Sequence, residues 1–175
     1  MVILQENDSQ FNTIEKDIFT EIDKLIKKAY AEKWGGNKMW TQKIKETLSE
    51  MVEKYKYISS SSIKDGGREW LYDLIWFKND EEGYFSELVL CMESEWYMDW
   101  NQIKYDFDKL LISNATHKLM ICQAYEDKMD EILDNFQQSI NRYQLGNKNE
   151  RFMISIYNAS KSDEHEFIHF VLTRD

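Results

Sequence analysis

Apolar residues recur every three or four positions in four stretches of the chain, and this spacing predicts four amphipathic helices. These stretches cover residues 10–33, 39–54 and 99–113, and the last runs from Met129 to near Gly146. Gly35 and Gly36 follow the first stretch, and glycine supplies the backbone angles found at a helix C-terminus. The pattern therefore predicts two helices before residue 55 and two more in the second half of the chain.

Short apolar and aromatic runs between these helices predict β-strands. The runs are residues 70–77, 85–96, 117–125, 152–157 and 167–173, with a weaker one at 55–61. Turn signals at residues 65–67 and 79–83 separate the early runs. Residues 88–92 are continuously apolar, as expected for a strand covered on both faces. Because helices interrupt the strands, we predict an α/β (α+β) fold with a central mixed sheet flanked by helices.

Length and composition are those of one folded domain. The 175 residues, 42% of them hydrophobic, fit a single domain with a core and exclude a disordered chain. We divide it into an N-terminal helical segment 1–38, a core 39–125, and a C-terminal helix and strands 126–175. No apolar run is long enough for a membrane span, and no secretion signal is visible. Cys91 and Cys122 lie in apolar runs, which indicates reduced core thiols of a cytoplasmic protein.

The charge is uneven along the chain. A net charge of −10 disfavours nucleic acid and anionic membranes, because phosphate neutralisation supplies most non-specific affinity. Residues 24–45, however, hold seven lysines and one glutamate, together with Trp34 and Trp40. This basic segment is either a solvated helix end or a contact surface for nucleic-acid backbone and bases. The candidate nucleic-acid contacts are Lys27, Lys28, Lys33, Lys38 and Lys43.

Three carboxylates stand where strands should be apolar. Asp73 interrupts the aromatic-rich run 70–77, and Glu93 and Glu95 end the run 85–96. Side chains alternate along a strand and neighbouring strands lie about 4.8 Å apart, so Asp73 and Glu93 can lie side by side. A hard divalent cation, Mg²⁺ or Mn²⁺, removes the repulsion between such carboxylates. The alternative is that Asp73 is hydrogen-bonded within its strand, and that Glu93 and Glu95 form the solvated strand end.

The predicted order over residues 39–125, helix–strand–strand–strand–helix–strand, resembles the core of the PD-(D/E)XK nuclease superfamily, the restriction-endonuclease-like fold. Asp73 matches the family's aspartate, and Met92-Glu93-Ser94-Glu95-Trp96 matches the position of its (D/E)-x-K motif. The resemblance implies a metal-dependent hydrolase of phosphodiester bonds, active or degenerate. It implies Mg²⁺ or Mn²⁺ held by Asp73, Glu93 and the carbonyl of Ser94. Glu95 would bind a second metal ion or orient the attacking water.

The chain departs from this family where Glu95 replaces the motif lysine. Other members supply the lysine from the following helix, which makes Lys109 the first candidate for a relocated lysine and Lys104 the second. On a helical wheel Lys104 flanks the Phe107/Leu110 face, whereas Lys109 lies away from it. A catalytic Lys109 therefore has to reach around its helix.

His165-Glu166-Phe167-Ile168-His169 matches the H-E-x-x-H zinc motif in its letters. That motif requires a helix to place both histidines on one face. The following Phe170-Val171-Leu172-Thr173 favours a strand instead, so we expect a terminal strand with surface histidines.

Function classes other than the nuclease remain open from the sequence. Net acidity also suits an acidic binding protein, such as an immunity protein or antitoxin-like inhibitor that covers a basic partner. A third alternative is a non-catalytic subunit of a nucleic-acid-processing complex. Convergence of Asp73, Glu93 and Glu95 would favour hydrolysis, and carboxylates spread over a convex face would favour a binding protein.

Overall fold

The structure is a computed structural model that describes residues 11–62, 70–148, 150–160 and 166–174. Within these residues the helices and strands follow one another in the predicted order. The elements are α1 (Thr13–Glu32), α2 (Asn37–Tyr55), β1 (Ile58–Ser61), β2 (Leu74–Asn79), β3 (Phe85–Glu95), α3 (Trp100–Ile112), β4 (His117–Ala124), a 3-10 turn (Glu126–Lys128), α4 (Met129–Arg142), β5 (Arg151–Asn158) and β6 (Phe167–Thr173).

The six strands form one mixed sheet in the order β1-β2-β3-β4-β5-β6. Strands β1, β2 and β3 pair antiparallel, β3, β4 and β5 pair parallel, and β6 returns antiparallel to β5. Parallel neighbours need a crossover connection, and α3 and α4 supply the two crossovers. The order from α2 to β4 is the helix–strand–strand–strand–helix–strand order predicted for residues 39–125.

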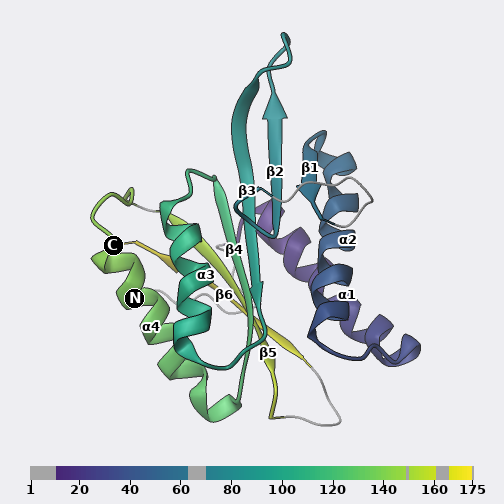
Figure 1. The fold of residues 1–175 in the computed structure, drawn as a ribbon, viewed down its shortest axis with the longest axis vertical. Coiled ribbons are helices and arrows are strands. Elements are labelled where there is room, and N and C mark those ends of the chain that lie inside the picture. The colour runs from purple at the N-terminus through teal and green to yellow at the C-terminus, as the bar shows by residue number, and fades with distance from the viewer. Residues whose placement is uncertain (1–10, 63–69, 149, 161–165, 175) are drawn as a thin grey trace.

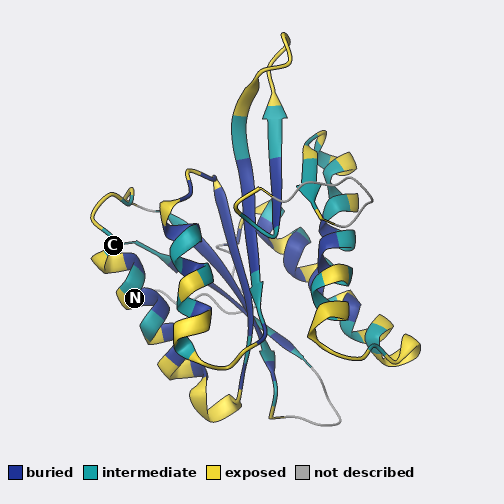
Figure 2. Ribbon diagram, viewed as in Figure 1, coloured by how far each residue is buried: buried dark blue, intermediate teal, exposed yellow. Residues whose placement is uncertain are grey.

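Helices cover both faces of the sheet, which gives three layers (Figure 1). Buried residues of α1 and α2, such as Ile22 and Leu48, pack with Leu90 and Met92 of β3. On the other face α3 and α4, represented by Phe107 and Phe136, pack with alternate residues of the same strands. Figure 2 shows the central strands buried along most of their length. The predicted fold class, a central sheet flanked by helices, is confirmed.

One strand boundary differs from the prediction in a way that concerns the site. Strand β2 begins at Leu74 rather than at residue 70, so Asp73 lies immediately before the strand and does not interrupt it. The reason is the short neighbour β1, whose last residue Ser61 pairs with Leu74. Trp70 and Leu71 are exposed ahead of the strand. The turn predicted at residues 65–67 lies outside the described residues.

Two further expectations from the sequence can be compared with the structure. Cys91 and Cys122 are buried free thiols, as predicted, and burial raises the pKa of each to about 12. Of the helices that the structure describes, none combines the length and the apolar character needed to cross a bilayer.

Candidate functional site

Asp73 is held against the end of β3 by hydrogen bonds from Ser94. The backbone N–H and the hydroxyl of Ser94 donate to Asp73 Oδ2 at 2.9 and 2.8 Å. The other carboxylate oxygen, Oδ1, lies 3.2 Å from the ammonium of Lys45 on α2. Asp73 thus contacts Ser94, the residue that follows Glu93, and its orientation is fixed by contacts to both of its oxygens.

Glu93 points to the opposite face of the sheet, toward α3. It is buried, and Lys109 Nζ lies 2.8 Å from its Oε1. The same ammonium lies 2.8 Å from Asp106, one helical turn earlier. Although Lys109 is at ion-pair distance, no donor among the described residues meets Glu93 Oε1 with hydrogen-bond geometry. The long side chain of Lys109 therefore does reach around α3, and it brings the candidate lysine to the candidate glutamate.

The proton affinity of Glu93 is high for a carboxylic acid. Burial raises its pKa to about 8, the ion pair with Lys109 opposes this rise, and the negative charge of Asp73 adds to it. Burial also acts to lower the pKa of Lys109, but its contacts with Asp106 and Glu93 outweigh that effect and the pKa is raised. Lys109 therefore stays protonated at neutral pH, whereas Glu93 retains a proton in a large fraction of molecules.

The raised pKa of Glu93 predicts a specific dependence of stability on pH. Between the unfolded value of 4.5 and the folded value of about 8, only the folded protein holds this proton. Unfolding then releases it, so the stabilisation is complete below pH 4.5 and is lost as the pH rises through about 8. Relative to wild type, the Glu93→Gln variant should gain on the order of a few kcal/mol between these limits. Urea denaturation of both proteins at a series of pH values measures the difference.

Glu87, on the same strand, is the matched control for this experiment. Its hydrogen bond from Lys78 lowers its pKa, so Glu87→Gln should show the opposite sign and become less stable than wild type as the pH rises. A Glu93→Gln difference that does not change with pH would contradict the assignment of a buried, proton-retaining carboxyl.

Glu95 does not join the other two carboxylates. Its Oε1 accepts a hydrogen bond from the backbone N–H of Tyr97 at 2.7 Å. Among the described residues no group of three or more His, Cys, Asp or Glu side chains is arranged to hold a metal ion. Asp73 and Glu93 are contacted from opposite faces of the sheet, by Lys45 and Lys109, but the negative charge of Asp73 still raises the pKa of Glu93. Mg²⁺ is commonly bound by one or two carboxylates and keeps several waters. The observation that supports this fit is the buried Glu93 Oε1, which has the Lys109 ammonium at ion-pair distance but no donor among the described residues with hydrogen-bond geometry.

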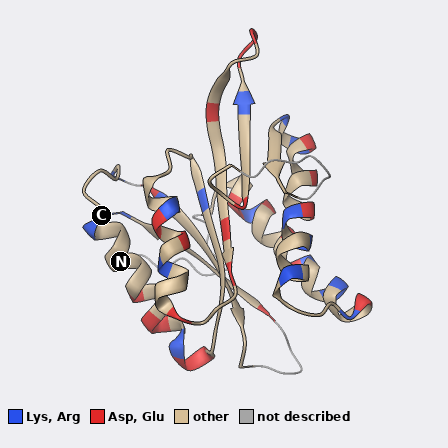
Figure 3. Cartoon of the chain, in the orientation of Figure 1, with Lys and Arg blue, Asp and Glu red and all other residues tan. Residues whose placement is uncertain are grey.

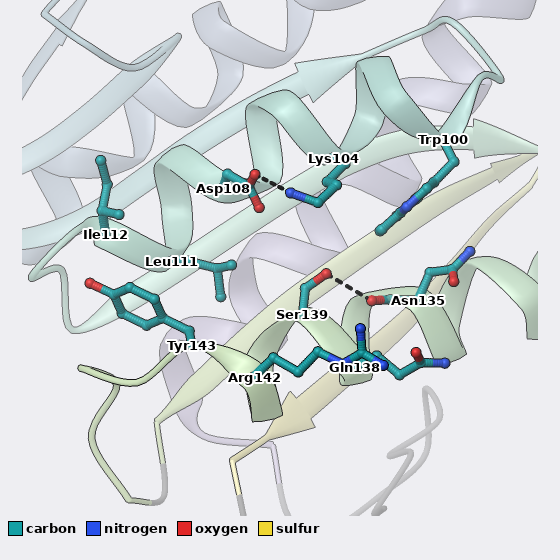
Figure 4. Close-up of a pocket in the computed structure, with 10 residues that line it drawn as sticks. All are labelled: Trp100, Lys104, Asp108, Leu111, Ile112, Asn135, Gln138, Ser139, Arg142 and Tyr143. Carbon is teal, nitrogen blue, oxygen red and sulfur yellow. Dashed lines mark hydrogen bonds and ion pairs between the residues drawn. The ribbon is translucent and has the colours of Figure 1, made fainter.

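Lys104, the second candidate lysine, faces away from this site. It pairs with Asp108 one turn later, and both line a hollow between α3 and α4 (Figure 4). Trp100, Asn135 and Arg142 also line this hollow, and none of the candidate carboxylates does. Of the two lysines considered on α3, the structure therefore places only Lys109 beside Glu93.

The basic segment lies at the C-terminal end of α1 and the start of α2, on the side of the sheet opposite α3 and α4 (Figure 3). Four of the five candidate lysines are exposed, namely Lys27, Lys28, Lys33 and Lys38. None of the described residues pairs with these four. Lys43 differs, because it is paired with Glu46 at 2.9 Å. These four side chains remain suited to backbone phosphates.

The two tryptophans of the segment are used in packing. The rings of Trp34 and Trp40 lie edge to face, with 5.3 Å between their centroids. Trp40 also contacts three other rings, those of Trp96, Tyr157 and Phe167. Both indoles are half-buried. Base stacking on them would require this aromatic cluster to open, so phosphate contact is the part of the expected interface that the geometry supports.

The second histidine of the H-E-x-x-H match is on a strand and not on a helix. His169 lies on strand β6, as predicted, but the expectation that it is a surface residue is wrong. Its ring stacks on Phe19 at 4.4 Å, and its nitrogens contact Ser155 and Asp23 at 2.9 Å each. Packing of α1 over the end of β6 buries it. His165 lies outside the described residues.

Lys45 and Asp106 are site residues that the sequence reasoning missed. Lys45 looked like one more cation of the basic segment, yet it is 6% exposed and contacts Asp73. A signal was available, since Lys45 shares its helical face with Leu48 and Val52 at steps of three and four. A lysine in an apolar stripe needs a buried acidic partner.

Comparison with protein-family models, curated proteins and solved structures finds no match for this chain. A functional assignment therefore depends on the residues of the site and on their geometry.

Proposed function

We propose that this protein is a metal-dependent nuclease that hydrolyses phosphodiester bonds at Asp73, Glu93 and Lys109. The observation that carries the proposal is the contact of Lys109 with Glu93 at 2.8 Å, next to the Asp73 that Ser94 holds in place. The element order from α2 to β4 supports it, because it is the order that the resemblance to the PD-(D/E)XK superfamily implies.

Each residue has a role that follows from its chemistry. Asp73 and Glu93 would hold Mg²⁺ or Mn²⁺, which when bound activates water and stabilises charge on phosphate oxygens. Lys109 remains cationic, so its ammonium can stabilise the negative charge that develops on the phosphate in the transition state. Asp106 holds the Lys109 ammonium from the solvent side. The Tyr97 contact of Glu95 leaves it poorly placed as a metal ligand, so a role in orienting water fits it better.

Cleavage of single- and double-stranded DNA and RNA tests the proposal directly. We expect phosphodiester hydrolysis in Mg²⁺ or Mn²⁺ and none in a chelator. Absence of cleavage of all four substrates in both metal ions would contradict it.

A second candidate function, binding of a basic protein, is favoured by the β2–β3 hairpin. This hairpin projects beyond the rest of the sheet (Figure 1), and its tip carries exposed Glu81 and Glu82. Three aromatic rings stack beside the tip, with 5.4 to 5.9 Å between ring centroids: Trp70, Phe77 and Phe85. An acidic tip next to exposed aromatic rings suits a cationic partner segment. A protein that cleaves no substrate but binds a polylysine peptide, and loses that binding in a Glu81→Lys/Glu82→Lys variant, would favour this second candidate.

A further inference from the structure

A hollow of about 430 Å³ lies on α2, on the side of the sheet opposite Lys109. Among the described residues it is lined by Lys38, Thr41, Gln42, Lys45 and Ser62. The four α2 residues recur at steps of three and four, so they share one helical face. The described part of the lining thus offers two ammonium groups, two hydroxyls and an amide, and it includes no carboxylate and no large apolar side chain.

The lining combines a buried lysine with an acidic partner and an exposed lysine. Lys45 is fixed, because its side chain is 7% exposed and its ammonium contacts Asp73 at 3.2 Å and Ser62 Oγ at 3.4 Å. Lys38 is exposed and pairs with none of the described residues. Two lysines and the Ser62 hydroxyl are groups that bind phosphate oxygens. The Thr41 hydroxyl instead accepts from Trp96 Nε1 and donates to Ser94 Oγ. The ligand class that this hollow fits is therefore a phosphate group.

A chain of polar contacts connects the hollow to the candidate site. Thr41 Oγ1 lies 3.1 Å from Ser94 Oγ, which donates to Asp73 Oδ2 at 2.8 Å. Lys45, which also lines the hollow, contacts the other carboxylate oxygen of Asp73, Oδ1. A phosphate in the hollow would therefore lie next to the carboxylate that we assign to the metal ion.

We propose that this hollow binds a phosphodiester group of the nucleic-acid strand on the α2 side of the candidate site, with Lys38 and Lys45 as its cations. The inference rests on the proposed nuclease function and names how the substrate is held. Exposed lysines of the basic segment (Lys27, Lys28 and Lys33) precede the hollow in the chain. The phosphate and Asp73 compete for Lys45, so strand binding loosens the contact of Lys45 with Asp73 Oδ1.

The test is binding of a fluorescently labelled short single-stranded DNA, in chelator so that no cleavage occurs, followed by anisotropy over a range of salt concentrations. Lys38→Met should weaken binding about tenfold. It should also reduce the steepness with which the logarithm of the binding constant falls with the logarithm of the salt concentration by about one, as for loss of one phosphate contact. Lys128→Met, in the 3-10 turn immediately before α4, is the matched control and should leave both unchanged.

Lys45 is tested in the Asp73→Asn background, because removing it alone would leave the Asp73 charge without its cation and endanger folding. Asp73→Asn by itself should tighten strand binding, since it removes the competing charge. Adding Lys45→Met should then weaken binding about tenfold, again with a smaller salt slope. Strand binding that is equal in wild type, Lys38→Met and the two Asp73→Asn proteins would overturn the inference, and the nuclease proposal would stand if wild type cleaves in Mg²⁺.

Two further arms identify the source of the phosphate. Oligonucleotides with 5′-phosphate and 5′-hydroxyl ends should bind equally, and inorganic phosphate should compete no better than sulfate of the same ionic strength. A Lys38-dependent preference for the 5′-phosphate or for inorganic phosphate would overturn the assignment to an internal phosphodiester. If wild type neither binds the strand nor cleaves, the inference and the proposed function both fail.

Discussion

Replacing Asp73 by asparagine or Glu93 by glutamine should lower metal-dependent cleavage at least a thousandfold. Each substitution keeps the shape of the side chain but removes an anionic oxygen ligand from a site that offers only two. The metal ion contributes several kcal/mol of charge stabilisation in the transition state, and each 1.4 kcal/mol corresponds to a factor of ten in rate. Initial cleavage rates in saturating Mg²⁺ and Mn²⁺ measure the effect.

Asp108→Asn is the matched control for these variants. Asp108 is also a carboxylate near a lysine, but it lines the hollow between α3 and α4 with Lys104. Its rate should stay within about twofold of wild type, because an exposed ion pair contributes at most about 0.5 kcal/mol. Cleavage that survives in Asp73→Asn or Glu93→Gln would place the active site elsewhere.

The sequence predicts the layers of this fold well because its helices and strands have clear periods. Phe107 and Leu110 repeat at helical spacing on α3, and the apolar run 88–92 lies in a strand that the structure buries on both faces. The position of Asp73 is less predictable, since the start of β2 depends on where its neighbour β1 ends. Strand ends follow from pairing partners that are distant in sequence, and residue pattern alone does not reveal them.

The site itself is only half predictable for a related reason. That Asp73 lies near the end of β3 follows from the spacing of neighbouring strands, although its contact is with Ser94. The contacts of Lys45 and Lys109 depend instead on how α2 and α3 cross the sheet, and on the reach of a flexible side chain. A helical wheel describes where a Cβ points. It therefore underestimates how far around the helix a lysine can reach, because the ammonium lies several bonds from the Cβ. His169 shows the same limit, because the helix that buries it lies more than a hundred residues earlier.

Lys109→Met should lower the cleavage rate about a hundredfold or more, the loss typical for one group that stabilises developing negative charge. The metal ligands Asp73 and Glu93 remain in this variant, so Mn²⁺ binding should persist while turnover falls. Lys104→Met is the matched control on the same helix and should leave the rate within about twofold of wild type, because its ion pair is exposed.

The pH profile separates a catalytic Lys109 from one that merely fills space. Lys109 lowers the pKa of Glu93 against the effect of burial, so its removal should move the acid limb of the rate profile to higher pH. Lys109→Arg keeps the positive charge and should restore the limb toward its wild-type position, while the altered geometry leaves the rate reduced. A Lys109→Met protein with the wild-type pH profile and a rate equal to that of Lys104→Met would show that the contact with Glu93 is structural, and the assignment of the relocated lysine would fall with it.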